Sequence, residues 1–195
     1  MKKTGLSLIF CLMVALAMGQ TTRSTNARPL SFYFGGGPTL SKFTGEEGDE
    51  TKMLVGAQVA LGLSLPVANN FSIVPELNVA MQGARYKVQE SSFRLWYLNL
   101  PVLARYRFGQ SGFFAETGPQ IGLLLDAKRV VDDDKDDVSE SFKSTSVNWN
   151  VGAGYMINEN LAINLRVAPG LTDIDKSDNY STKQFTSALR VLFSF

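Results

Sequence analysis

The fold of this chain is decided by the stretch Ser146-Val-Asn-Trp-Asn-Val-Gly-Ala-Gly-Tyr-Met-Ile157. Apolar side chains occupy every second position, and mostly small or polar side chains lie between them. The apolar set is Val147, Trp149, Val151, Ala153, Tyr155 and Ile157, and the other set is Ser146, Asn148, Asn150, Gly152 and Gly154. A period of two places the sets on opposite faces of a β-strand, because an α-helix repeats about every 3.6 residues. The stretch therefore predicts a strand with one apolar and one polar face.

The same alternation recurs from residue 30 to the end of the chain. In the last segment, for example, Leu189 and Val191 alternate with Ala188 and Arg190. Eight strands are predicted in this way, at residues 30–40, 52–65, 71–84, 93–108, 113–125, 145–157, 161–171 and 183–195. Strands of soluble proteins usually have about five or six residues, whereas roughly 9–11 residues are needed to cross a bilayer. The lengths of the predicted strands favour a membrane protein.

Alternation alone leaves two architectures open. A soluble lipocalin-like barrel has its apolar face inside, and a membrane barrel has that face against lipid. Connection lengths favour the membrane barrel, because tight turns alternate with longer polar loops. The turns are 66–70, 109–112 and 158–160, and the loops are 41–51, 85–92, 126–144 and 172–182. Short periplasmic turns and long outer loops are typical of outer-membrane proteins. We therefore expect an all-β fold, an eight-stranded antiparallel up-and-down transmembrane β-barrel with both termini in the periplasm.

Aromatic residues near the predicted strand ends agree with a membrane barrel. Phe93 and Trp96 mark one predicted rim. The other rim is marked by Phe71, Tyr106, Phe108, Phe113, Tyr155 and Phe195. Aromatic girdles of this kind lie at the two membrane–water interfaces. The less apolar strand face is rich in Gly, Ala, Ser, Asn and Gln, which suits a narrow, packed lumen.

The first residues have the pattern of a secretory signal peptide. Lys2 and Lys3 precede an apolar run from Leu6 to Ala17, and Ala17 and Gly19 are small residues suited to a cleavage site. The run is shorter than the roughly 20 residues of a spanning helix, which argues against a membrane anchor. We therefore expect a cleaved signal peptide at 1–19, a short periplasmic N-terminal segment at 20–29 and the outer-membrane β-barrel at 30–195.

Composition argues against several functional classes. The chain has no histidine, and its single cysteine, Cys11, lies within the predicted signal peptide. We therefore expect no His-based triad, His metal site, thiol nucleophile or disulfide in the exported part. Removing Lys2 and Lys3 leaves 17 of 19 basic residues against 18 acidic ones, a balance that indicates no nucleic-acid partner. The prediction is a protein that is not an enzyme and has no cofactor.

Two neighbouring segments carry a family resemblance. They read Tyr97-Leu-Asn-Leu-Pro-Val-Leu-Ala-Arg-Tyr-Arg-Phe108 and Phe113-Phe-Ala-Glu-Thr-Gly-Pro-Gln-Ile-Gly-Leu-Leu-Leu-Asp-Ala-Lys128. With the opening Phe34-Gly-Gly-Gly-Pro-Thr-Leu-Ser41, this hairpin resembles the outer-membrane β-barrel family of Bacteroidetes, whose members include porin-family and PorT-like small barrels. The resemblance implies an eight-stranded barrel without catalytic residues. The terminal Phe195 resembles the signal read by the barrel-assembly machinery.

Five charged residues fall on the predicted lumen face: Glu76, Arg105, Glu116, Arg166 and Arg190. The turn at 109–112 sets a register in which Arg105 lies opposite Glu116, so these two should form an ion pair. The five residues could line a gated polar path. We favour a salt-bridge network that plugs the lumen, because unpaired charges there would be costly and eight strands leave little free bore.

Two further motifs have a functional and a structural interpretation. The acidic run at residues 132–137 could bind Ca²⁺, but it lacks EF-hand spacing, and such runs are usually solvated loop tips. The glycines Gly35 to Gly37 suggest a phosphate loop, but no Lys-Ser or Lys-Thr follows. Close packing or a β-bulge is the simpler reading of these glycines. No metal site is therefore predicted.

The sequence predicts the cellular location of the protein more clearly than its function. We expect it in the bacterial outer membrane, with a structural or surface-interaction role. Its expected partners are outer-membrane lipid and glycolipid, the barrel-assembly machinery, and a surface or secretion-system protein. A small-solute porin or channel is one alternative, and an accessory barrel of a secretion system is another.

Overall fold

The computed structural model describes residues 30–195 apart from 46–50, 87–90, 132–133 and 177–180. The predicted signal peptide and the segment 20–29 lie outside the described residues. Within the described part, the chain forms nine β-strands and one short 3₁₀ turn. They are β1 (Ser31–Gly45), β2 (Thr51–Ala68), β3 (Phe71–Tyr86), β4 (Ser92–Arg107), β5 (Phe113–Val131), β6 (Asp134–Asp137), η2 (Ser139–Ser141), β7 (Thr145–Met156), β8 (Leu161–Pro169) and β9 (Thr182–Ser194).

Eight of these strands form a closed antiparallel barrel. The hydrogen-bonded order is β4-β3-β2-β1-β9-β8-β7-β5, and β4 also pairs with β5, which closes the sheet. In hydrocarbon every backbone N–H and C=O group needs a partner within the protein, and a closed sheet satisfies this requirement without leaving an edge. No helix in the described part is long and apolar enough to cross a membrane. The predicted eight-stranded barrel is thus confirmed.

The outer connections differ from those predicted. Most strands extend further at the outer end than expected, and β5 continues to Val131 inside the predicted loop 126–144, whereas β8 ends at Pro169, two residues earlier than predicted. The chain then folds back as β6, which pairs with the end of β5 alone. In this hairpin Lys128 lies opposite Asp137 and Arg129 lies opposite Asp136. Opposite charges on facing strands favour pairing, and this arrangement extends a hairpin where a polar loop was predicted.

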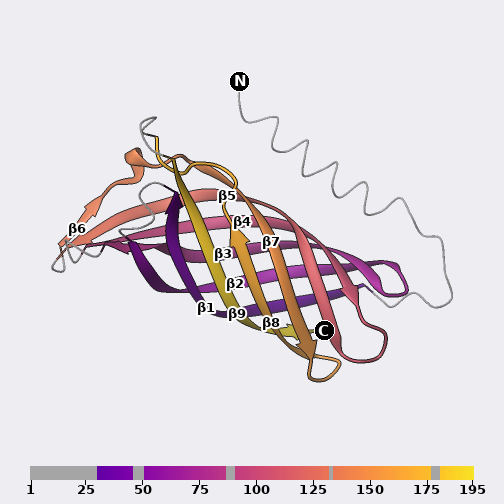
Figure 1. The fold of residues 1–195 in the computed structure, drawn as a ribbon. Helices are drawn as coiled ribbons and strands as arrows, with labels where there is room; N and C mark the ends of the chain where they lie inside the picture. Colours follow the sequence, from indigo (N-terminus) through magenta and orange to yellow (C-terminus); the bar gives the residue numbers. More distant parts are fainter. Residues whose placement is uncertain (1–29, 46–50, 87–90, 132–133, 177–180) are drawn as a thin grey trace.

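The tight turns and both ends of the described chain lie at one end of the barrel, and β6 lies at the other (Figure 1). Phe32 in β1 and the terminal Phe195 exchange backbone hydrogen bonds of 3.3 and 3.0 Å, which ties the first strand to the last. In an outer-membrane barrel the end with short turns faces the periplasm. We call the opposite end, which carries β6 and η2, the outer end.

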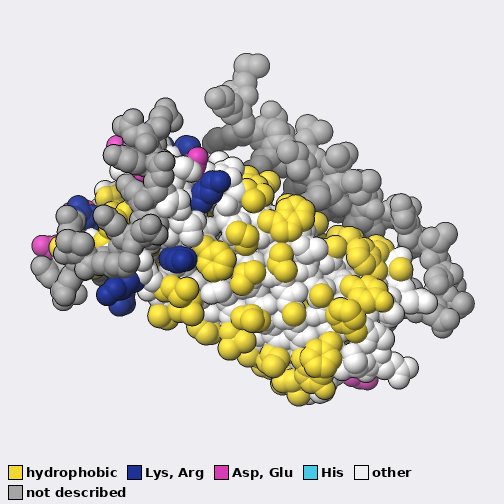
Figure 2. Space-filling model, viewed as in Figure 1, with side chains coloured by type: hydrophobic (Ala, Val, Ile, Leu, Met, Phe, Trp, Pro, Cys, Tyr) yellow, Lys and Arg dark blue, Asp and Glu magenta, His cyan; other side chains and the backbone are white. Residues whose placement is uncertain are grey.

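The outward face of the strands is apolar, as the alternation predicted. Leu165 of β8 and Leu189 of β9 are 57% and 54% exposed although they lie at the middle of the barrel wall. Figure 2 shows hydrophobic side chains covering the barrel wall in a broad band. An exposed apolar surface of this extent is far larger than soluble monomers tolerate, whereas lipid covers it in a membrane.

One predicted rim residue has a different position. Trp96 is outward and 41% exposed, but Phe93 points into the lumen, where its ring centroid lies 6.4 Å from that of Phe43 and 5.9 Å from that of Phe142. The assignment of Phe93 to an aromatic girdle was therefore wrong. Phe93 and Trp96 are three positions apart, so strand alternation places them on opposite faces.

The glycine run near the start of β1 serves close packing. A Cβ added to Gly35 would lie 2.4 Å from Cδ2 of Leu192 on β9. On β2, a Cβ at Gly62 would lie 2.1 Å from the ring of Tyr33. These glycines make room inside the barrel for large inward side chains of neighbouring strands, and no phosphate loop is needed to explain them.

Replacing Leu165 with arginine tests which face meets the lipid. Leu165→Arg should lower the free energy of unfolding in lipid vesicles by about 2–4 kcal/mol, because it places a charge at the middle of the hydrocarbon band. The control is Leu171→Arg, just beyond β8 at the outer end, which should cost about 0–1 kcal/mol. Equal, small losses in urea titrations of both variants would contradict a lipid-facing apolar wall.

Candidate functional site

The five charged residues predicted for the lumen meet at one level of the barrel. Glu76 belongs to β3, Arg105 to β4 and Glu116 to β5, whereas Arg166 belongs to β8 and Arg190 to β9. All five side chains point inward, and none is more than 6% exposed. We call these five residues the lumen network. It joins one side of the barrel wall to the other across the bore.

Arg105 and Glu116 form the first pair of the network. The β4–β5 register places them directly opposite each other. Both Nε and Nη2 of Arg105 donate to Oε2 of Glu116, at 3.0 and 2.8 Å. The register follows from the turn between the strands, where the backbone N–H of Phe108 donates to the carbonyl of Phe113 at 2.9 Å. Two charge-assisted bonds from one guanidinium to the same oxygen restrict the orientation of Arg105 as well as its position.

Arg166 connects the two carboxylates across the lumen. Its Nη2 lies 2.7 Å from Oε1 of Glu116, and its Nη1 lies 2.9 Å from Oε1 of Glu76. Arg190 makes a second connection from β9, with Nη1 2.8 Å from Oε1 of Glu76 and Nη2 3.4 Å from Oε1 of Glu116. Each carboxylate thus contacts more than one arginine, and every member of the network has an ionic partner.

Three neutral residues that the sequence analysis did not single out complete the network. The Tyr33 hydroxyl donates to Oε2 of Glu76, and Oδ1 of Asn164 accepts bonds of 3.0 and 2.8 Å from Arg190. The Arg105 guanidinium lies 5.4 Å from the Tyr33 ring centroid and 4.7 Å from that of Phe114, within cation–π range. Their inward phase was readable from alternation. Asn164 lies directly opposite Arg190 in the β8–β9 register, and Phe114 is on the strand that pairs with that of Arg105, whereas Tyr33 reaches Glu76 over the intervening strand β2.

The electrostatic balance of the network favours a fixed arrangement. Three arginines surround two glutamates, so the cluster carries one excess positive charge that the two aromatic rings partly accommodate. A buried ion pair is costly to form but very costly to break on one side, because the partner is left buried and uncompensated. The hydrogen-bonded arginines should therefore hold their positions across the bore.

Two apolar clusters lie on either side of the lumen network. The inward positions of β3 show the sequence of layers along the barrel axis: Val74, Glu76, Asn78 and Ala84 follow one another from the periplasmic to the outer end. The periplasmic cluster consists of Tyr33, Val74, Leu103, Phe114, Ala162 and Leu192. The outer cluster consists of Phe43, Ala84, Leu95, Tyr97, Ala127, Phe142 and Ile174.

Loop residues help to form the outer cluster. Phe142, between η2 and β7, is 6% exposed, and Ile174, between β8 and β9, is 1% exposed. The Ile174 carbonyl also accepts a 2.7 Å bond from the backbone N–H of Lys143, which joins the two loops. The loops therefore fold over the outer mouth and place apolar side chains in it. No pattern in the sequence indicated this closure.

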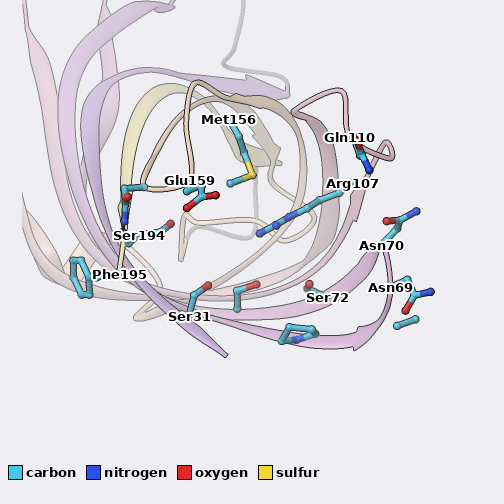
Figure 3. A pocket seen from close by; sticks show the side chains of 14 residues that line it. Ser31, Asn69, Asn70, Ser72, Arg107, Gln110, Met156, Glu159, Ser194 and Phe195 are labelled. Atoms are coloured by element: carbon cyan, nitrogen blue, oxygen red, sulfur yellow. Dashed lines mark hydrogen bonds between the residues drawn. The ribbon is translucent and has the colours of Figure 1, made fainter. Parts of the chain in front are cut away.

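A hollow of about 590 Å³ opens at the periplasmic end. Figure 3 shows Arg107, Met156 and Glu159 pointing into it from the barrel wall and the β7–β8 turn. Met156 also packs against the periplasmic apolar cluster, so this cluster forms the inner boundary of the hollow. The hollow is a vestibule on the periplasmic side of the lumen network.

The acidic run has no metal-binding arrangement in the part that the structure describes. Residues 132–133 lie outside the described residues, and Asp134–Asp137 form β6. The backbone N–H of Ser139 donates to Asp137 at 2.9 Å and lowers the pKa of that exposed carboxyl group. Among the described residues, no group of three or more His, Cys, Asp or Glu side chains could hold a metal ion.

Comparisons with known proteins agree with the geometry. A family model described as "Outer membrane protein beta-barrel domain" matches residues 18–176. Neisserial surface protein A has a similar solved structure, with a TM-score of 0.54, 16% identity, and coverage of 86% of this chain and 100% of that one. Ail of Yersinia pestis, solved with the heparin analogue sucrose octasulfate, gives a TM-score of 0.52 at 15% identity, with 86% and 100% covered. No curated protein matches significantly.

The energetic role of the lumen network can be measured with Glu116→Gln. This change leaves three buried arginines with one carboxylate and should lower the free energy of unfolding by about 3–5 kcal/mol. The matched control is Asp126→Asn, which breaks the partly exposed Lys128–Asp126 pair and should cost no more than about 1 kcal/mol. Similar losses in urea titrations of the two variants would show that the buried pairs contribute no more than a surface pair.

Proposed function

Since this chain belongs to the outer membrane protein β-barrel domain family, we propose that it is a closed, non-conducting barrel of the bacterial outer membrane with a structural or surface-interaction role. Its place in the outer membrane follows from the family and the fold. The single observation that carries the proposal is the lumen network, in which Arg166 and Arg190 bridge Glu76 and Glu116 across the bore.

Three layers in series support a closed lumen. A hydrated ion or small solute would meet the periplasmic apolar cluster, then the lumen network, and then the outer apolar cluster. Hydrophobic constrictions exclude water, and the lumen network could open only by separating charges that are buried together. An eight-stranded barrel is also narrow enough for side chains to fill its interior. These features disfavour the small-solute channel.

A role at the cell surface is supported by the outer end. There β6, η2 and the segment after β8 build a structured cap, and the Phe142 and Asp175 backbones form a bridge between two of its loops. Structured loops on a rigid scaffold are where binding residues usually lie. Ail, which shares the fold, was crystallised with a sulfated ligand. An accessory role in secretion, which the PorT-like resemblance implies, stays a prediction, and no catalytic activity is proposed.

Conductance in planar lipid bilayers tests the closed lumen. The purified, folded protein should insert without producing stepwise currents of the size expected for a water-filled pore. The double variant Phe142→Ala/Ile174→Ala removes the outer apolar plug and should also remain silent, because the lumen network still spans the bore.

Two controls are needed to interpret an absence of current. A general porin in the same bilayer shows that an open pore is detected. Protein recovered from parallel vesicles should show heat-dependent mobility on a mild SDS gel, which establishes that folded barrel was present. Reproducible current steps from the unaltered protein would contradict the proposal and favour the channel.

A further inference from the structure

Within the described part of the chain, the positive side chains on the outside of the barrel are confined to its outer end. Among the residues that the structure describes, the eight barrel strands carry six such Lys or Arg residues beyond the lumen face: Lys42, Lys52, Arg85, Arg94, Lys128 and Lys183. In the strand register, Lys52 lies opposite Arg85 and Arg94 lies opposite Lys128. Lys183 lies opposite Thr44, two positions after Lys42. Figure 2 shows dark blue side chains only towards the outer end, beside the apolar band.

The periplasmic rim is different. Its outward side chains are aromatic: Tyr106, Phe108, Phe113, Tyr155 and Phe195 are each at least 39% exposed. Arg107, the basic residue of this end, points into the periplasmic vestibule instead (Figure 3). Both rims therefore have aromatic or apolar contacts for the membrane interface, but only the outer rim adds positive charge. This asymmetry indicates different lipid chemistry on the two sides.

A depression of about 220 Å³ lies within the outer positive rim on β3, β4 and β5. Its lining combines Met81, Arg94, Trp96, Asp126, Lys128 and Val130. The register places Arg94 opposite Lys128 and Trp96 opposite Asp126, so all four side chains project from adjacent strands on the outside. Nζ of Lys128 lies 3.0 Å from Oδ2 of Asp126, which holds the lysine beside the depression.

Arg94 brings a guanidinium group to the lining of this site. Its Nε is inaccessible to solvent and has no hydrogen-bond partner among the described residues. A guanidinium presents its donors in a planar fork that matches two oxygens of a phosphate group. The excess of two cations over one carboxylate leaves the depression with a net positive charge. The chemistry of the site fits a phosphate ester.

The position of the site relative to the apolar band indicates what carries that phosphate. Along β4, Leu98 and Leu100 continue the outward face below Trp96, at about 3.3 Å per residue. A ligand that placed its phosphate at Arg94 and Lys128 would therefore have its apolar part against Trp96 and the leucines. Tryptophan at this level is typical of the boundary between acyl chains and headgroups.

We propose that the depression around Arg94, Lys128 and Trp96 binds the phosphate group of a phosphorylated glycolipid in the outer leaflet. Arg94 donates to the phosphate oxygens, Lys128 adds a point charge, and Trp96 and Met81 contact the first carbons of the acyl chains. The remaining cations of the outer rim attract neighbouring lipid phosphates. The inference names a lipid partner for the surface-interaction part of the proposed function and is independent of whether the lumen conducts.

Trp96 provides a reporter for the test. The chain has two tryptophans, so Trp149→Phe leaves Trp96 as the single one. In a neutral detergent, titration with diphosphorylated lipid A should change the Trp96 emission to saturation. Dephosphorylated lipid A with the same acyl chains should bind at least about tenfold more weakly, since it lacks the charged hydrogen bonds. Equal binding of the two lipids, or saturation by inorganic phosphate alone, would overturn the proposal.

Matched charge-removing variants locate the site. In the same background, Arg94→Gln/Lys128→Gln should weaken lipid A binding at least about tenfold. Lys143→Gln/Lys176→Gln removes the same charge from the outer loops and should leave the affinity unchanged. Equal affinities for the two double variants would refute the location. Unaltered heat-dependent mobility and absent bilayer currents distinguish failure of this inference from failure of the closed-barrel proposal.

Discussion

The structure depends on one constraint, that a backbone crossing hydrocarbon must pair all its N–H and C=O groups within the protein. The chain meets this constraint because β4 and β5, the two end strands of the eight-stranded order, pair with each other, so that the barrel sheet has no open edge. Closure of the sheet imposes two further requirements on the side chains. One side chain of every two must then tolerate lipid, and the others must fill a narrow interior. Glycines such as Gly62 opposite the Tyr33 ring show how closely that interior is packed.

The interior combines ionic and apolar packing. Placing Glu76 and Glu116 within a barrel is unfavourable by itself, and three arginines offset this cost: Arg166 and Arg190 contact both carboxylates, and Arg105 contacts Glu116. The bonds of Arg190 to Glu76 join residues that are 114 positions apart in the chain. Such links stabilise the closed barrel as a unit instead of one hairpin. The apolar clusters above and below exclude water, which strengthens the ionic contacts between them.

The exterior has an asymmetry that the interior does not require. A uniform apolar band with aromatic rims would satisfy the bilayer on both sides. The cations at the outer end are additional, and they follow β9, β1, β2, β3, β4 and β5 but not β7 or β8 in the described residues. A surface that meets a phosphorylated leaflet on one side accounts for this distribution. In the functions that we propose, the lumen and the outer rim have separate tasks: the first closes the barrel and the second contacts the lipids around it.

The sequence by itself determined the architecture, because a period of two over long segments and the alternation of turn and loop lengths are local properties. They were sufficient for eight strands, for the outward apolar face and, through the 109–112 turn, for Arg105 opposite Glu116. Local patterns failed where side chains meet across the bore. The loop residues Phe142 and Ile174 in the outer mouth, and the bonds of Arg166 and Arg190 to the carboxylates of β3 and β5, are contacts between distant segments. Only closure of the barrel decides them, since it alone brings β1, β8 and β9 opposite β3, β4 and β5.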